Sequence, residues 1–291
     1  MDERDWLAER FQEQRPRLRA VAYRILGSTS EADDALQEAW IRLGRADAGA
    51  IENLPAWFVT VVGRVALNML RSRRRRGEQL MDARLPDPIV DPMDGMDPEH
   101  EALLADSVGL ALLVVLETLT PAERLAYVLH DMFSVPFEEI GAILDRSPDA
   151  ARQLASRARR RIRGIDASPH PDRTAQQEVV DAFLAAARHG DFDALVAVLD
   201  PDIVLREDRG TGTLLTIQGA ENVARRARSV SQLGLDVRRA LINGAPGWVS
   251  LLRGDLFAVA ALSTRDGRVA TMDILLDRER LARVDVTRLE G

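Results

Sequence analysis

The chain of 291 residues is longer than one typical hydrophobic core, which predicts two or three domains. It has no cysteine, so disulfide bonds, thiolate zinc sites and cysteine nucleophiles are excluded, and no apolar run reaches the ~18 residues of a membrane span. The net charge is −7, every basic residue is arginine, and the N-terminus is acidic and unlike a signal peptide. These features predict a cytoplasmic protein, and no motif calls for a metal or a cofactor.

The first 43 residues predict helices. Apolar residues recur at helical spacing as far as Leu26, Pro16 is expected to open a second helix, and Gly27 to end it. Residues 28–31 form a capping box ahead of an amphipathic helix over residues 31–43. Its expected buried face is Ala32, Leu36, Ala39, Trp40 and Leu43, and its outer face carries Asp33, Asp34, Gln37, Glu38 and Ile41. This acidic face is either a partner surface or a means of solubility.

A Gly/Ala/Asp-rich loop at residues 44–54 precedes a long helix that starts at Pro55. One stripe of this helix is apolar and comprises Phe58, Val61, Val62, Val65 and Met69. A second line along it comprises Trp57, Thr60, Arg64, Asn68 and Arg71. Such a mixture suits unpaired DNA, because bases stack on aromatic rings and phosphates pair with arginine. The alternative for Trp57 is an ordinary core aromatic.

Residues 81–104 contain four prolines among many acidic residues, a composition that predicts a tether without a core of its own. This acidic stretch separates two basic clusters, at residues 71–76 and 146–163.

Residues 105–163 predict a second helical domain. After a helix over residues 105–117, Thr120 to Glu123 form another capping box. Residues 137–163 then give a short helix, a turn at Asp145 to Ser147, and a helix whose first residue is Pro148. In this last helix Ala151, Leu154, Ala155, Ala158 and Ile162 form a packing stripe, while Arg152, Ser156, Arg159, Arg160 and Arg163 gather on the other side. The pattern is typical of a helix-turn-helix that enters the DNA major groove; the alternative is a solvated basic helix.

Residues 164–172 are predicted to be a second domain boundary, and the sequence beyond them has a different pattern of elements. Two helices are predicted up to Leu199, followed by strands at residues 203–205, 214–217, 237–242, 248–252, 256–262 and 269–276 and a helix at 219–230. Residues 265–268 predict a hairpin turn. Helices followed by a curved antiparallel sheet give an α+β cone, in which Asp273 is the one plausible pocket acid, although a structural or solvent-facing role is the stronger interpretation.

Four motifs in order resemble an extracytoplasmic-function (ECF) sigma factor of RNA polymerase: residues 30–40, Ala56-Trp57 leading to residues 67–73, Leu119 to Arg124, and the helix-turn-helix. The resemblance covers residues 5–165 and implies two all-α domains, region 2 (1–80) and region 4 (105–165), joined by a linker (81–104). It implies that region 2 binds the polymerase β′ clamp helices and the −10 element, and that region 4 binds the β flap and the −35 element. The implied polymerase contacts are Asp34, Gln37, Glu38 and Ile41; the −10 contacts are Asn53, Trp57, Arg64, Asn68 and Arg71; the −35 contacts are Arg152, Gln153, Ser156, Arg157, Arg159 and Arg160.

Residues 172–291 resemble the SnoaL-like fold, and Leu85-Pro86-Asp87-Pro88 is similar to the linker signature of the SigJ-type ECF group that carries this extension. The group has two further motifs, whose counterparts here start at Asp208 and Asp277 and depart from the pattern. The resemblance implies a regulatory domain that acts in cis, as an anti-sigma factor acts in trans. Our hypothesis is that this domain packs between the two DNA-binding domains in the free protein and touches the linker near residues 85–88. The cone is also expected to offer room for a small apolar ligand.

Two other classes are weighed against the sigma factor. A stand-alone regulator would bind DNA as a dimer without polymerase. A SnoaL-like enzyme would need paired acid and base groups around Asp273, and the sequence supplies no second member of such a pair. We therefore expect a sigma factor that is not an enzyme, with RNA polymerase and promoter DNA as its partners.

Overall fold

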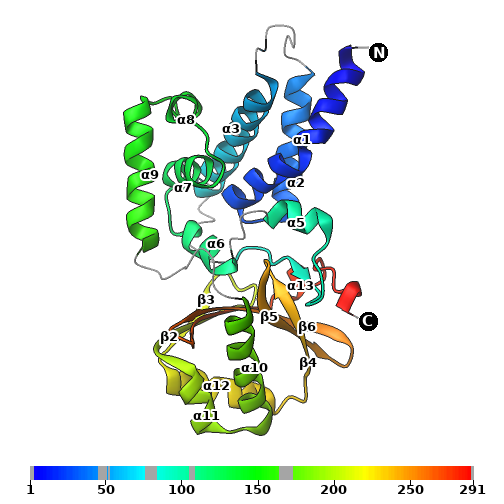
Figure 1. Cartoon of the computed structure of the whole chain (residues 1–291), viewed down its shortest axis with the longest axis vertical. Helices are drawn as coiled ribbons and strands as arrows, with labels where there is room; N and C mark the ends of the chain where they lie inside the picture. The colour runs from blue at the N-terminus through cyan, green and yellow to red at the C-terminus, as the bar shows by residue number, and fades with distance from the viewer. Residues whose placement is uncertain are drawn as a thin grey trace. The chain divides into compact units, whose positions relative to one another are not determined.

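The computed structural model describes residues 3–44, 51, 53–75, 84–104, 109–163 and 173–289 (Figure 1). The chain divides into two compact units: Met1–Leu80, Glu101–Asp106 and Val115–Ile165 form the first, and Met81–His100, Ser107–Val114 and Asp166–Gly291 form the second. Most of the predicted loop at 44–54, Arg76 and the whole predicted boundary at 164–172 lie outside the described residues. In the part of the chain that is described, no helix is long and apolar enough to cross a membrane.

Three helices open the first unit: α1 (Glu3–Leu26), α2 (Thr29–Leu43) and α3 (Leu54–Arg75). Helix α1 runs through Pro16, so the prediction that this proline opens a second helix is wrong. A proline costs a helix one hydrogen bond, but buried Phe11 and Leu18 lie on either side and keep this one continuous. Gly27 ends α1 with a φ of 72°, and the Ser28 side chain caps α2 by accepting from the Glu31 amide.

The rest of the first unit is built from α7 (Pro121–Tyr127), the π-helical turn η2 (Val128–Met132), α8 (Phe137–Leu144) and α9 (Pro148–Arg163). Helix α6 (Leu110–Glu117) is divided between the two units, and its residues from Val115 onward belong to the first. The predicted capping box at Thr120 and Glu123 is present. All five residues of the predicted packing stripe of α9 are buried. The turn between α8 and α9 is tight, because a Cβ on Gly141 would lie 2.7 Å from the Arg146 carbonyl oxygen. The predicted helix-turn-helix is therefore present.

Helix α3 packs directly on α7 and α8. At Gly63 a Cβ would lie 3.5 Å from side-chain atoms of both Leu129 and Ile143, so the small residue permits the close approach. Arg124, 2% exposed, donates from Nε to the Arg24 carbonyl (3.2 Å) and pairs with Glu117 (2.8 Å). The helices predicted for region 2 and region 4 thus share one compact unit.

The second unit combines α10 (Arg173–His189), α11 (Phe192–Val198) and α12 (Ala220–Ser231) with a sheet. Its strands are β2 (Leu199–Asp208), β3 (Leu214–Gln218), β4 (Asp236–Ile242), β5 (Ala245–Leu252), β6 (Asp255–Arg265) and β7 (Arg268–Leu275). With β1 (Val90–Asp91) the order is β1-β4-β5-β6-β7-β2-β3, and every neighbouring pair is antiparallel except β2 and β7. This is the predicted curved sheet with helices ahead of it.

Two tight turns fix the register of the sheet. The predicted hairpin places Asp266 and Gly267 at positive φ (51° and 70°) between β6 and β7. Asn243 and Gly244, also at positive φ (52° and 76°), join β4 to β5 in the same way. Asn-Gly is the commonest signal for such a turn. The three helices bury one face of the sheet, where the rings of Phe183 and Trp248 stack 5.5 Å apart.

The linker is not the structureless tether that its composition predicted. Strand β1 pairs with β4 through Val90↔Ile242 and Asp91↔Leu241, and helix α5 (Pro98–Leu104) follows. Leu85, Ile89 and Val90 are at most 7% exposed. These apolar residues stand between the prolines and acids, and β4 offers an open edge with unpaired backbone groups. The linker thereby adds a strand to the sheet.

Candidate nucleic-acid interface and linker contact

The residues predicted to face the −35 element lie along α9 as expected from its period. Arg152, Gln153, Ser156, Arg157 and Arg160 are exposed, and Arg159 is half-buried. A helix with one packed stripe and an exposed row of guanidinium groups can enter a major groove, donating to guanine and to phosphates.

Two of these arginines are held by neighbouring groups. Arg152 pairs with Asp149, and its guanidinium carbon lies 5.2 Å from the centre of the Phe137 ring on α8. Arg159 donates from Nε to Asp131 at 2.6 Å, a hydrogen bond that raises the pKa of the guanidinium further above its usual range. Arg152 is thus oriented at the start of α9, whereas Arg159 ties α9 to η2.

The line predicted to meet the −10 element lies on α3, and its members have different surroundings. Asn68 is exposed and Arg71 half-buried. Asn53 is exposed, and its Oδ1 accepts from the Ala56 amide (3.1 Å), so it caps α3. Arg64 donates from Nη2 to the Ala142 carbonyl of α8 at 2.9 Å. A side chain predicted to hold DNA is therefore engaged within the first unit.

Two further residues of α3 are less exposed than a simple DNA-contacting role would require: Trp57 is half-buried and Arg73 is buried. The Trp57 ring lies 5.7 Å from that of Phe58 in an edge arrangement. Arg73, in the predicted basic cluster, is buried, pairs with Glu31 and donates to the Leu26 carbonyl at 3.3 Å. Arg73 holds helices together, because its burial keeps it from phosphates.

The face of α2 predicted to bind polymerase borders two open grooves. One, of about 430 Å³ between α1 and α2, is lined in part by Asp34, Gln37 and Trp40. The other, of about 450 Å³ between α2 and α3, brings Asp34 and Glu38 together with Asn68. Ile41 is 42% exposed, as predicted for the outer face.

Trp40 was predicted to be buried, which is wrong. It is 36% exposed, and its ring lies 5.2 Å from that of Phe11. Buried Ala39 and Leu43 already fill the packing stripe of α2, so the large ring at position 40 falls at its edge. An aromatic residue three positions after Gln37 on a helix was the sequence signal that could have placed it on this face.

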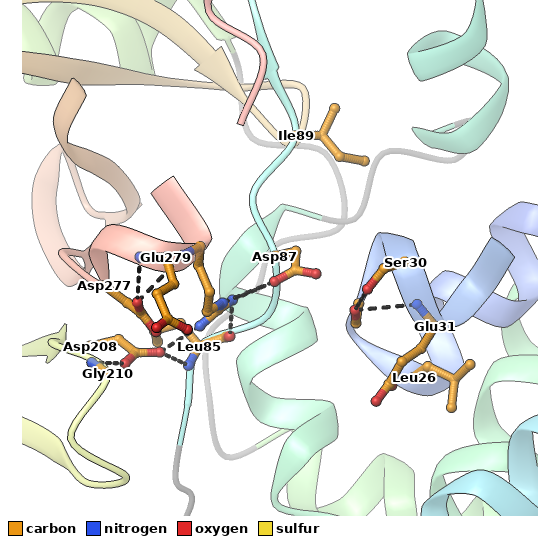
Figure 2. Close-up of polar contacts among 12 residues, drawn as sticks. Leu26, Ser30, Glu31, Leu85, Asp87, Ile89, Asp208, Gly210, Asp277 and Glu279 are labelled. Atoms are coloured by element: carbon orange, nitrogen blue, oxygen red, sulfur yellow. Dashed lines mark hydrogen bonds and ion pairs between the residues drawn. The ribbon is translucent and has the colours of Figure 1, made fainter. Parts of the chain in front are cut away.

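Besides the pairing of β1 with β4, one cluster holds the linker; we call it the linker contact and define it as Leu85, Asp87, Asp208 and Arg280. Figure 2 labels the first three of these residues. Asp208, 2% exposed, accepts from the Leu85 amide (2.8 Å) and from Arg280 Nη1 (2.7 Å). Arg280 also donates to the Leu85 carbonyl (2.7 Å) and to Asp87 (2.7 Å). One guanidinium thus joins two carboxylates and a backbone carbonyl.

The two motifs that depart from the SigJ-type pattern, which start at Asp208 and Asp277, supply and position residues of the linker contact. Asp277 caps α13 (Arg278–Leu281) by accepting from the Glu279 amide, which orients Arg280 (Figure 2). Gly210 donates its amide to Asp208, and its φ is 72°. A Cβ there would lie 2.7 Å from the Asp277 carboxyl carbon, so this position requires glycine.

Residues 86 and 88–91 extend the attachment beyond the linker contact. Pro86 and Pro88 are buried. The Ile89 amide donates to the Asn243 side chain (3.1 Å), and the Asn243 amide donates to the Ile89 carbonyl (2.8 Å). Arg280 and Asn243 were not singled out as linker partners in the sequence. The signal for Arg280 was a positive charge at the second-to-last position of the 277–281 motif.

The cone holds a cavity, and Asp273 is not its acid. Asp273, 1% exposed, pairs with Arg206 (2.6 Å), while the neighbours of both along β7 and β2 line the cavity. Because side chains alternate along a strand, Asp273 and Arg206 lie on the opposite face of the sheet. Complete burial raises the pKa of Asp273, and Arg206 opposes that effect. The acid that borders the cavity is Glu207.

Comparisons with known proteins agree with this arrangement. Residues 11–76 match the family model of sigma-70 region 2, and residues 109–162 match that of sigma-70 region 4. The two helical modules therefore define an RNA polymerase sigma factor, the class of protein that confers promoter-specific transcription initiation.

Full-length relatives give the family. The ECF RNA polymerase sigma factor SigJ of Mycobacterium tuberculosis is 36% identical over 90% of this chain and 89% of its own length. A probable ECF sigma factor SigI of the same species is 33% identical over 97% of both chains. The crystal structure of M. tuberculosis SigJ matches 96% of this chain and 100% of its own, with a TM-score of 0.75 and 31% identity. The chain belongs to the ECF family of RNA polymerase sigma factors, which initiate transcription rather than catalyse a reaction of their own.

Proposed function

We propose that α9 reads the −35 element and that α3 holds the −10 element. We also propose that α2 binds the β′ clamp helices of RNA polymerase, that region 4 binds its β flap, and that the protein acts in the cytoplasm. The exposed row of Arg152, Gln153, Ser156, Arg157 and Arg160 supports the first assignment. Exposed Asn68 and half-buried Trp57 and Arg71 support the second. The net charge of −7 leaves little general attraction to DNA, so promoter binding depends on polymerase.

The second unit controls this activity in cis by holding the linker that connects the two promoter-binding regions. The linker contact is the observation that carries this proposal. Asp208 is buried and Arg280 is only 12% exposed on its side chain, so the ion pair is shielded from water and salt. Residues 84–91 are thereby fixed to the sheet and cannot serve as a free tether between regions 2 and 4.

The freedom of the linker matters because regions 2 and 4 pack against each other within the first unit, an arrangement that we call the closed form. Helix α3 packs on α8, and Arg64 donates to the Ala142 carbonyl. Meeting two separated promoter elements requires α3 and α9 to move apart. Releasing eight linker residues would add up to roughly 26–29 Å of extended reach, so the docked linker favours the closed form and its release favours promoter binding.

Hydrogen exchange of the amides in residues 85–91 tests this control. The Leu85 and Ile89 amides are bonded to Asp208 and Asn243, so their exchange should be slow in the free chain. On binding to core polymerase and promoter DNA, we expect this protection to fall at least tenfold while the β5 and β6 amides stay protected. Undiminished protection in the initiation complex would show that the linker stays docked and does not gate activity.

A further inference from the structure

The cone cavity is a second site in the second unit. It has a volume of about 240 Å³ and lies between α12 and strands β2, β5, β6 and β7. Most of its wall is apolar and includes Val223, Val230, Trp248, Phe257, Met272 and Ile274. An engineered cavity of about 150 Å³ with such a wall binds benzene, so this one has room for roughly ten non-hydrogen atoms.

One side of the cavity borders a cluster of two arginines and one glutamate, of which Arg226 and Glu207 line the cavity and Arg209 does not. Glu207 accepts from Arg226 at 2.6 and 3.0 Å and from Arg209 at 2.5 and 3.1 Å. Two guanidinium groups thus share one carboxylate, which leaves one positive charge. Burial raises the pKa of Glu207, but the two arginines together hold it below its usual range, so the carboxylate is ionised at neutral pH. Among the described residues, Nη1 of Arg226 has no hydrogen-bond partner, and Arg226 lines the cavity.

The opposite side carries a buried hydroxyl. Ser250 on β5 is 4% exposed and lines the cavity, and in the described part of the chain its hydroxyl makes no hydrogen bond. Strands β6 and β7 separate it from Glu207 on β2. The Ser250 oxygen is not one of the described side-chain atoms that are fully buried without a partner, so it is open to the cavity and available for a hydrogen bond to a bound molecule.

We propose that the cone cavity binds a small, mainly apolar carboxylic acid, its carboxylate on Arg226 and its apolar body against Trp248 and Met272. A second acceptor or hydroxyl at the far end of the molecule would meet Ser250. The apolar wall excludes a sugar or nucleotide, and the excess guanidinium charge disfavours a cation. This site goes beyond the proposed function, since neither DNA nor the linker contact uses it.

Isothermal titration of the full chain with 4-ethylbenzoate and with 4-ethylbenzamide tests the proposal, because the two probes match in size and differ in charge. We expect the acid to bind with at least about fivefold lower Kd than the amide. Equal affinities would overturn the anion preference, and no saturable binding of either probe at millimolar concentration would overturn the site.

Substitutions on α12 and on β2 should change the affinity for the acid in opposite directions. Arg226→Met should remove the preference for the acid, whereas Arg225→Met, the adjacent residue outside the cavity wall, should leave it unchanged. Glu207→Gln should strengthen binding of the acid and not of the amide, since it removes the competing carboxylate. Circular dichroism checks that each variant is folded. A loss of the preference in Arg225→Met, or unchanged binding in both Arg226→Met and Glu207→Gln, would overturn the assignment. The titration contains no polymerase or DNA, so its failure is separate from any failure of the proposed function.

Discussion

Arg152 is the residue of α9 that we propose to read a base. Its contacts with Asp149 and Phe137 fix it at the start of the helix, where a recognition helix meets base edges. Arg152→Ala in the polymerase complex should reduce discrimination between matched and mismatched −35 sequences by about 1–3 kcal/mol. Arg160→Ala, further along the helix, should weaken all promoters alike. Competition binding to the two promoter sets measures both; equal loss on both sets for Arg152→Ala would show that it does not read bases.

Glu207 should make the stability of the second unit depend on pH. Its pKa is held below the ordinary value of 4.5 by Arg226 and Arg209, against the effect of burial. A carboxyl with a lowered folded pKa contributes stability that is present above the unfolded pKa and lost as pH falls through the folded one. Glu207→Gln should therefore cost about 1–3 kcal/mol at pH 7, and the difference should shrink below about pH 4.5. Urea unfolding at both pH values measures it; a cost independent of pH would contradict the account.

Sequence reasoning placed the residues of α9 well and missed Glu207, the acid that borders the cone cavity, for a physical reason. A period of 3.6 residues fixes the faces of a helix that packs on one side only. On β2 and β7 both faces are buried, so burial does not tell which face points into the cavity. The sequence named Asp273 as the one plausible pocket acid but favoured a structural or solvent-facing role, and Asp273 forms a buried ion pair with Arg206. Glu207 was not considered, because a shift of one residue along a strand reverses the face.

At the scale of elements, the attachment of β1 to β4 depends on the turn at Asn243. Asn243→Gly retains the positive φ of the turn but removes the side-chain acceptor of the Ile89 amide. The unpaired amide should cost about 1–3 kcal/mol and accelerate exchange of Ile89. Asp266→Gly, at a φ of 51° in the exposed β6–β7 turn, is the matched control. Hydrogen exchange by mass spectrometry compares the two; equal exchange of the linker in both variants would show that Asn243 does not hold it.

The linker also shows where composition misleads. Prolines and acids predicted a tether, and the few apolar residues among them were too sparse to suggest a strand. Leu85, Ile89 and Val90 are buried only because β4 has a free edge and because Arg280, nearly two hundred residues later, neutralises Asp87. Contacts of such long range leave no periodic pattern in the sequence. The resemblance to the SigJ-type group, by contrast, pointed to residues 85–88 directly.

At the scale of the whole molecule, one chain combines a promoter-reading unit with a unit that holds the linker between its two regions. The first unit is closed through α3 and α8, and the second fixes the segment that must extend for opening. In the proposed control in cis, docking of the linker and opening of the first unit compete for the same residues, 84–91. A molecule in the cone cavity would act on the same unit through α12 and β2.

The central claim is that the linker contact restrains initiation, and run-off transcription with core RNA polymerase tests it most directly. Arg280→Ala leaves the buried Asp208 carboxylate without its cationic partner, which should cost about 3–5 kcal/mol and release the linker. Arg278→Ala, on the same short helix but exposed, is the control. On promoters selected from genomic DNA, we predict more transcript with Arg280→Ala than with the native chain or the control. Equal transcript from all three proteins, with hydrogen exchange showing the linker released in Arg280→Ala, would contradict the claim.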